Sequence, residues 1–144
     1  MLTALIAVLG TLAGSAIAHL SQRSQRRATE VRARRTEALT AVADLATALA
    51  DHRRAMWVRE DLRLRGEDWV DARAESHATR SAITAPLLRV QVLLPAVAPA
   101  AQAAAHAAYS LRAAESEAEL RTRRDNAITT ADDLVTAAAL SLAA

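Results

Sequence analysis

A chain of 144 residues without a single cysteine carries no disulfide framework, no thiolate nucleophile and no cysteine-based metal site. Its aromatic residues are two tryptophans and one tyrosine, and it contains no phenylalanine. Alanine is its most frequent residue. Because alanine favours helix and buries little area, we predict a thin helical core. Such a core is marginally stable as a monomer and is helped by self-association.

The net charge of +2 conceals an uneven distribution of arginines, which supply all 18 basic residues. Residues 1–37 hold six arginines and two glutamates, a balance of +4, whereas residues 38–144 hold 12 arginines and 14 acidic residues, a balance of −2. We attribute the exclusive use of arginine to GC-rich codons; the alternative is selection for guanidinium groups that bind phosphate. Because the basic excess is N-terminal, we do not expect residues 38–144 to bind polyanions generally.

The first 22 residues carry no charged side chain and include an apolar run of the length that spans a bilayer. Arginines beside such a span favour the cytoplasmic side of the membrane. We therefore predict a transmembrane anchor over residues 1–22, in a single-pass protein of the cell membrane. Its N-terminus would lie outside the cell, and its C-terminal domain would be cytoplasmic.

A cleaved secretory signal is the alternative interpretation of the same segment. Ala16, Ile17 and Ala18 form a small-residue cleavage site, and the protein would then be secreted after cleavage behind Ala18. A signal peptide needs a positively charged start, however, and Met1 to Thr3 supply only the α-amino group. The downstream arginines would also have to cross the membrane. We therefore prefer the uncleaved anchor.

Small residues recur every four positions along the predicted span, at Gly10, Gly14 and Ala18. This spacing lets two transmembrane helices approach closely and pack. It predicts a helix-pairing face and a homodimer or higher oligomer. The ordinary abundance of glycine and alanine in membrane helices is the other explanation, and the sequence leaves both open.

A basic juxtamembrane arm over residues 23–37 follows the span and is polar on all its faces. Clustered arginines next to a span are attracted to anionic lipid headgroups. A simple solvated flank explains the same residues equally well. The six arginines that we predict to contact anionic lipid are Arg23, Arg26, Arg27, Arg32, Arg34 and Arg35.

Apolar residues at helical spacing continue through residues 38–144, which we predict to be a cytoplasmic helical domain. The fold class is all-α: the transmembrane helix continues into a long helix and is followed by an antiparallel, alanine-rich helical bundle. The expected buried stripes are Ala38, Leu39, Val42, Leu45, Ala46, Leu49, Met56 and Trp57; Val97, Ala101, Ala104, Ala108 and Leu111; and Leu120, Ala127, Ile128, Ala131, Leu134, Val135, Ala138 and Leu142.

The helix boundaries follow from glycine, proline and capping residues. The first break comes at Gly66, and Asp68 is placed to cap the next helix. Pro86 is expected to kink or end that helix. Residues 87–94 have strand-like composition, but we interpret them as helix because no partner strand exists. Ser116 and the glutamate three residues later form a capping box for the last helix.

The chain lacks the residue patterns of known catalytic or metal sites. It contains no paired-histidine motif, no glycine-rich phosphate loop and no serine nucleophile signature. His52 and His77 could meet across a helical hairpin, but two histidines make half a metal site. Trp57 and Trp69 are better explained by core packing than by ligand binding. We therefore predict no catalytic residue, no cofactor site and no metal site, and expect a protein that is not an enzyme.

The sequence LTALIAVLGTLAGS, the arm QRSQRR, and the segments AMWVRE and LRLRGEDW together resemble the KilB-type small membrane proteins. Members of this family occur on conjugative plasmids of filamentous actinobacteria and as chromosomal relatives. The resemblance is firmest over residues 1–35. It implies a membrane-associated accessory role in the spread of transferred plasmid, and it implies no catalytic residue.

We therefore expect a non-enzymatic, membrane-anchored helical protein that acts in plasmid transfer or a related envelope assembly. Its expected partners are the membrane, anionic headgroups, further copies of itself and an unknown protein. The alternatives are the secreted protein, a membrane-tethered adaptor, and a nucleic-acid binder that uses the arginine arm. Nucleic acid is not the expected partner, because lipid is the nearer anion.

Overall fold

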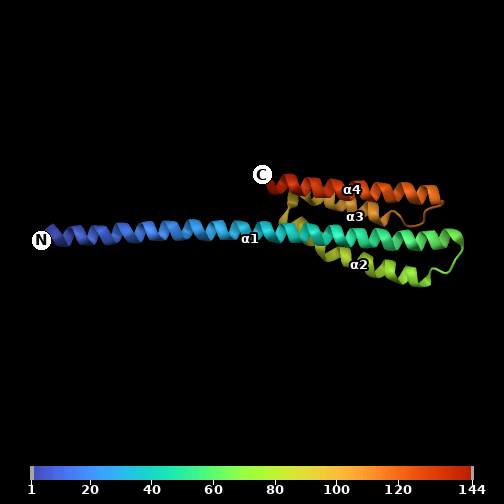
Figure 1. Cartoon of the computed structure of the whole chain (residues 1–144), viewed down its shortest axis with the longest axis horizontal. Helices are drawn as coiled ribbons and strands as arrows, with labels where there is room; N and C mark the ends of the chain where they lie inside the picture. The colour runs from blue at the N-terminus through green and yellow to red at the C-terminus, as the bar shows by residue number, and fades with distance from the viewer. Residues whose placement is uncertain (1, 144) are drawn as a thin grey trace. The chain divides into compact units, whose positions relative to one another are not determined.

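A computed structural model describes the backbone of residues 2–143 and the side chains of residues 22, 23 and 25–143. Over that backbone the chain forms four α-helices, one short 3-10 helix and no strand (Figure 1). The predicted all-α class is therefore confirmed. Residues 87–93 belong to a helix, as predicted, although their composition would suit a strand.

The helices are long except for the third. Helix α1 spans Leu2–Arg65 and α2 spans Val70–Leu93; the 3-10 helix η1 covers Pro95–Val97, followed by α3 over Ala98–Tyr109 and α4 over Glu117–Ala143. The chain divides into two units, Met1–Thr36 and Glu37–Ala144.

The N-terminal unit contains the predicted anchor and most of the predicted arm. Where side chains are described, from residue 22 onward and excepting residue 24, every residue of this unit is exposed. No helix within the described residues combines the length and apolar character needed to cross a membrane. Apart from Gln22, the predicted span lies outside the residues whose side chains are described, and so do Gly10, Gly14 and Ala18.

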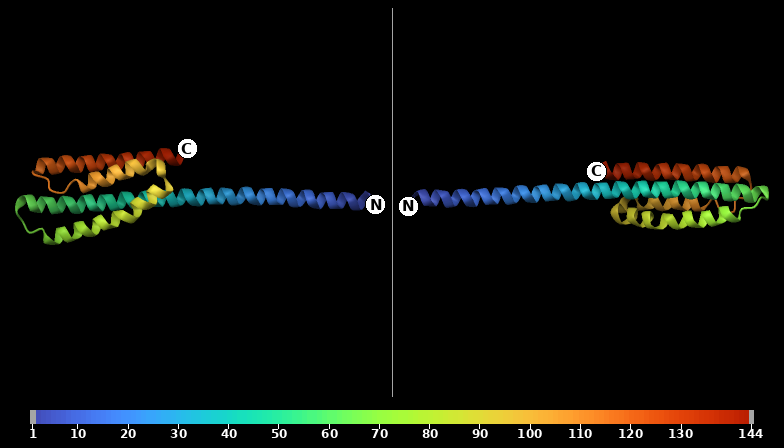
Figure 2. Two further views of the ribbon diagram at one scale, coloured as in Figure 1. Left: turned by 180° about the vertical axis from the view of Figure 1, so that it is seen from behind. Right: turned by 60° about the horizontal axis from the view of Figure 1, so that its bottom comes forward.

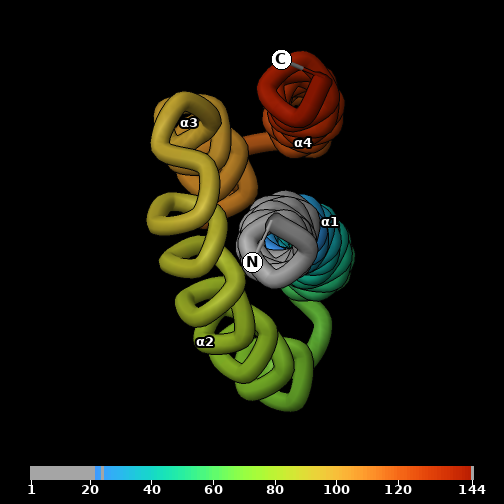
Figure 3. The backbone as a smooth tube through the Cα atoms, turned by 90° about the vertical axis from the view of Figure 1, so that its left-hand side faces the viewer, coloured from blue at the N-terminus to red at the C-terminus, as the bar shows by residue number. Residues whose placement is uncertain are grey.

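The second unit is a helical bundle in which successive helices run antiparallel (Figure 2). Within this unit, α2, α3 and α4 pack around the part of α1 that begins at Glu37 (Figure 3). The main core cluster joins all four helices, and its fully buried large residues include Leu45, Ile83 and Leu134. A second cluster around Met56, Leu111 and Leu120 closes the other end.

Helix α3 contributes its core contacts through alanine. Its buried residues are Ala101, Ala104, Ala105, Ala107 and Ala108. Because alanine has a short side chain, neighbouring helices can approach α3 closely, while each contact removes little area from water. The thin, alanine-rich core that the composition predicts is therefore present in this bundle.

The predicted stripes are mostly buried or half-buried, but two of their residues are exposed. Leu39 is 52% exposed and Val135 is 49% exposed. Each follows a fully or nearly buried residue, and consecutive residues of an α-helix point about 100° apart. The prediction was wrong for these two positions because a stripe that includes adjacent residues is wider than the face this small bundle can cover.

Helix α1 ends at the predicted break, where Gly66 has a φ of +71°. The Gly66 N–H donates to the Arg63 carbonyl at 3.2 Å, and the Glu67 N–H donates to the Leu62 carbonyl at 3.0 Å. This pair of bonds is a Schellman motif, which requires a left-handed residue after the helix. The N-cap residue of α2 is Trp69, and the Asp68 carboxylate, one residue before the cap, accepts from the Val70 N–H at 3.0 Å.

Substituting Gly66 with alanine is expected to destabilise the bundle by about 1–2 kcal/mol, because an L-residue is strained at this φ. A Cβ atom at this position would meet nothing within 4 Å, so backbone strain is the sole expected cause. The measurement is the free energy of unfolding in urea. Unchanged stability in the Gly66→Ala variant would show that the turn relaxes to another conformation at no cost.

Helix α2 continues through Pro86, which neither ends it nor prevents the next two turns. Helix α4 begins behind the predicted capping box, where the Ser116 hydroxyl accepts from the Glu119 N–H at 3.2 Å. The Glu119 carboxylate accepts from the N–H of Glu115 at 2.7 Å, one residue before the serine. The box therefore holds the start of α4 and the loop before it together.

Candidate functional site

The six arginines of the predicted arm are all solvent-exposed. None of them takes part in an ion pair among the residues whose side chains are described. Arg23, Arg27 and Arg34 lie within about 40° of one another around the helix, whereas Arg32 lies on the opposite side. The arm therefore presents cationic groups on more than one face.

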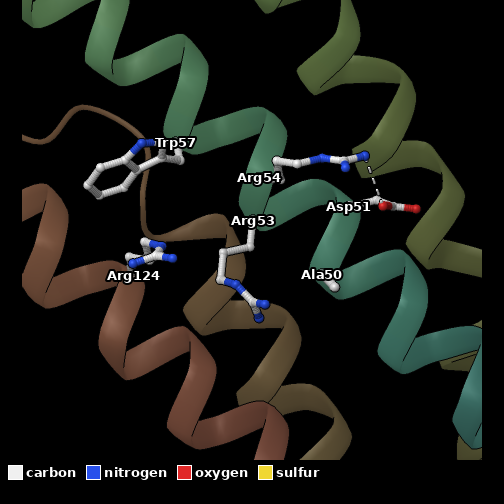
Figure 4. A pocket seen from close by; sticks show the side chains of 6 residues that line it. All are labelled: Ala50, Asp51, Arg53, Arg54, Trp57 and Arg124. Carbon is white, nitrogen blue, oxygen red and sulfur yellow. Dashed lines mark hydrogen bonds and ion pairs between the residues drawn. The ribbon is translucent and has the colours of Figure 1, made fainter.

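Two further groups of arginines line pockets in the second unit, which the sequence did not predict. The outer pocket, about 490 Å³ in volume, is lined by Ala50, Asp51, Arg53, Arg54, Trp57 and Arg124. Figure 4 shows Trp57 from α1 beside Arg124 from α4, with the guanidinium carbon 5.1 Å from the ring centroid. Arg54 points towards Asp51 instead, at 3.3 Å. This pocket is an open surface feature.

The inner pocket is smaller, about 150 Å³, and more enclosed. Three helices and the turn after α3 contribute to it. Its lining residues are His52, Met56 and Arg59 from α1; Ser76, His77 and Arg80 from α2; and Tyr109 and Arg112 from the end of α3 and the turn that follows. Three of these eight residues are arginines, and none is acidic.

His52 is buried at 1% exposure, although histidine at an exposed or core-edge position is the usual case. Its Nδ1 lies 3.1 Å from the Thr79 hydroxyl. That hydroxyl donates to the Glu75 carbonyl at 3.0 Å, so it accepts from His52 Nδ1–H. The other ring nitrogen, Nε2, has no hydrogen-bond partner within the described residues. The ring also contacts Tyr109 edge-on, with centroids 5.5 Å apart.

Arg59 is 9% exposed and is held from three sides. Its terminal nitrogen donates to the Ser76 hydroxyl at 3.2 Å, and its guanidinium lies 5.4 Å from the Trp69 ring centroid. Its Nε is 3.5 Å from Glu60 Oε1, a distance of ion pairing without hydrogen-bond geometry. Arg59 is thereby fixed in position while part of its donor capacity stays unused.

Glu60 is fully buried, and its carboxylate offsets the positive charge of the neighbouring arginines Arg59 and Arg63. It accepts from Arg63 Nε at 2.6 Å. Arg63 also donates to the Ala114 carbonyl in the loop before α4. Glu60 is a charged residue on the apolar face of α1, and its side chain faces inward as an ion pair. Its partner Arg63 links α1 to the loop between α3 and α4.

The electrostatics of the inner pocket are positive. Burial lowers the pKa of His52 to about 4, and the charges of Arg80 and Arg59 act in the same direction. Burial lowers the pKa of Arg59 as well; the Glu60 carboxylate opposes this shift, and three neighbouring arginines reinforce it. Burial is the largest cause of both shifts, and the charges of neighbouring arginines act in the same direction as burial.

The sequence did contain a partial signal for this pocket. His52 and Glu60 continue the i, i+3, i+4 spacing of Leu49 and Met56, so they lie on the buried face of α1. His52 and His77 both line the pocket, yet no group of three metal-ligand side chains occurs where side chains are described. The meeting of arginines from α1, α2 and the turn after α3 depends on tertiary packing and had no local signal.

Comparison with known proteins gives two matches. Residues 39–142 match a family model described as the KilB plasmid transfer protein. Protein KilB of Streptomyces lividans is 61% identical over 142 residues, which cover 96% of this chain and 97% of that protein. No solved structure matches the chain. The matched family segment includes every residue that lines the two pockets.

Proposed function

The chain belongs to the KilB plasmid transfer protein family, and on this premise we propose that it is a non-enzymatic accessory protein of plasmid transfer that is anchored in the cell membrane. The observation that carries the membrane part of the proposal is the uncharged segment 1–22 followed by six exposed arginines. The resemblance that the sequence alone indicated is thus confirmed at the level of the family.

The proposed orientation follows from charge. An apolar helix of this length is stable across the hydrocarbon layer, and arginines within about 15–20 residues of its end stay in the cytoplasm. The second unit, Glu37–Ala144, would then be cytoplasmic, and the arm would lie next to anionic headgroups, each arginine contributing about 1 kcal/mol near the surface. Anionic lipid and further copies of the chain are the proposed partners, together with an unidentified protein.

The chemistry of the two pockets supports binding over catalysis. Both are lined by guanidinium groups, which stay protonated at neutral pH and therefore bind anions without exchanging protons. His52, the one histidine buried in the inner pocket, has a pKa of about 4 and is neutral under the same conditions. We propose that the protein acts through its anchor and its surfaces.

Fractionation of cells that carry a C-terminally tagged chain tests the anchor. The proposal expects the tag to stay with membranes after carbonate extraction and to be protected when spheroplasts are treated with protease. A fully soluble tag would overturn the membrane part. Mature protein that begins at His19 in the culture medium would establish the secreted alternative instead.

Replacing all six arm arginines with glutamine tests the orientation. We expect a substantial fraction of tags to become sensitive to external protease, because the charge bias that keeps this flank inside has been removed. The matched control replaces Arg53 and Arg54, which lie too far from the span to affect orientation. Equal protection of the tag in the arm variant and in the control would refute the proposed role of the arm.

A further inference from the structure

The inner pocket contains buried polar groups whose bonding capacity is not used. Among the described residues, His52 Nε2 has no hydrogen-bond partner, and Arg59 Nε meets Glu60 at ion-pair distance only. Buried polar groups in native proteins are normally satisfied by protein, by water or by a ligand. Both residues are at least nine-tenths buried and line the same pocket, so a partner for the unpaired His52 nitrogen would lie there.

Two more arginines, Arg80 and Arg112, line the pocket and have no acidic partner among the described residues. No carboxylate among the described residues lies within 4.0 Å of the Arg80 or Arg112 guanidinium. Arg80 is held over the Tyr109 ring, with its guanidinium carbon 4.1 Å from the centroid. The Arg112 N–H donates to the Tyr109 carbonyl at 3.3 Å, which fixes the backbone of that turn.

The charges in and beside the pocket do not balance. Arg59, Arg80 and Arg112 line it, and Arg63 pairs with Glu60 next to it. Glu60 is already shared between Arg59 and Arg63, so the remaining guanidinium groups have no anion of their own. Holding like charges together in a partly desolvated space is unfavourable unless an anion joins them. The pocket is therefore incomplete as a purely structural feature.

We propose that the inner pocket binds a terminal phosphoryl group, carried by inorganic phosphate or by a phosphate monoester, between Arg59, Arg80 and Arg112. The planar guanidinium group of arginine fits the oxygens of phosphate. Because a phosphoryl group has several oxygens, it can accept charge-assisted hydrogen bonds from arginines on several sides. The Ser76 hydroxyl and the neutral His52 ring add polar groups to the lining, and Nε2 can accept a hydrogen bond from a protonated phosphate oxygen.

The volume fits this class of ligand. The pocket holds about 150 Å³, whereas a single water needs roughly 10–15 Å³ by the same kind of measure. That is room for a tetrahedral phosphoryl group with a few waters or a short ester arm. The pocket is small and only partly open, so it fits a terminal phosphoryl group better than a phosphodiester chain that must pass through it, and nucleic acid is not the proposed ligand. The outer pocket, which contains an acid and is open, is a separate surface.

Titration calorimetry on the full-length chain in detergent micelles tests the proposal, with inorganic phosphate, glycerol 3-phosphate and short-chain phosphatidic acid as probes at constant ionic strength. We expect saturable binding of at least one probe. The Arg80→Gln and Arg112→Gln variants should each raise Kd by about ten- to a hundredfold, because each removes charge-assisted bonds. Both arginines are solvent-exposed, so neither change should unfold the bundle.

The control variant is Arg54→Gln, whose guanidinium pairs with Asp51 in the outer pocket. It should leave Kd unchanged, and the probe that binds best should raise the melting temperature of wild type and control but not of the two pocket variants. The relative affinities of the soluble and lipid probes show whether the phosphoryl group comes from a free metabolite or from a headgroup.

No saturable binding of any probe would overturn the proposal, as would equal binding by the pocket variants and wild type. Tighter binding of single-stranded DNA, which carries diesters only, with the same loss in Arg112→Gln would also overturn it. The proposal of a membrane anchor and the proposal of a phosphoryl pocket can be refuted independently, because the first rests on residues 1–35 and the second on residues 52–112.

Discussion

Replacement of Glu60 with alanine is expected to lower the free energy of unfolding by about 3–5 kcal/mol, because it leaves a buried positive charge without its partner. Glu60 is fully buried and lies 2.6 Å from Arg63 and 3.5 Å from Arg59. Arg59 is nearly buried as well and has no other carboxylate within ion-pair distance among the described residues. The loss should appear as a lower midpoint of urea unfolding, which is measured by tryptophan fluorescence.

The neighbouring Asp61 provides the matched control. It pairs with Arg65 at 2.6 Å, and both side chains are substantially exposed, at 31% and 48%. Asp61→Ala should therefore cost less than about 1 kcal/mol. A double variant that replaces both Glu60 and Arg59 with apolar residues should recover part of the stability, because the unpaired charge has been removed. A small effect of Glu60→Ala alone would mean that water reaches the site and solvates Arg59.

The helices were predictable because their signals are local. Gly66, Asp68 and Ser116 set boundaries through their own backbone or through residues two to five positions away, and the structure shows the bonds that these roles require. The apolar stripes of α3 and α4 were also visible, since helical spacing alone decides which residues share a face. Local rules fail where two adjacent residues compete for burial, as at Leu39, and at Pro86, which does not end α2.

The pockets were not predictable because they depend on contacts distant in the sequence. Arg59 and Arg112 are separated in the chain by the whole of α2, η1 and α3, and only packing brings both to one cavity. The balance of −2 over residues 38–144 pointed away from anion binding. That sum averages over surfaces that face different ways, whereas electrostatic interactions weaken within about 8–10 Å in salt solution. Local grouping, not net charge, decides where an anion can bind.

Acid is expected to destabilise the bundle through His52 before the carboxylates titrate. The folded pKa is about 4, whereas the unfolded value is 6.5, so above pH 6.5 the ring is neutral in both states and its titration costs no stability. As the pH falls through 6.5 towards 4, the unfolded chain takes up a proton that the folded chain refuses. The free energy of unfolding should therefore fall by about 3 kcal/mol across this range.

The groups that face His52 support this direction. Arg80 and Arg59 repel a protonated ring, and no carboxylate lines the pocket to stabilise it. Glu119 cannot produce the same effect, because hydrogen bonds from the Glu115 N–H and Arg123 lower its pKa. A carboxylate with a lowered pKa loses its contribution only below its unfolded value of about 4.3. The interval between pH 6.5 and pH 5 therefore isolates the histidine.

His52→Gln is the informative variant, since its amide can still bond to Thr79 but cannot titrate. Urea denaturation in phosphate-free buffers should show a wild-type stability that falls between pH 6.5 and pH 5 and a variant stability that stays nearly constant. His106→Gln, at an exposed position, should retain the wild-type slope. If His52→Gln kept the full slope, the neutral ring would not be what makes the fold sensitive to acid. The proton uptake would then have to be assigned to groups outside the pocket.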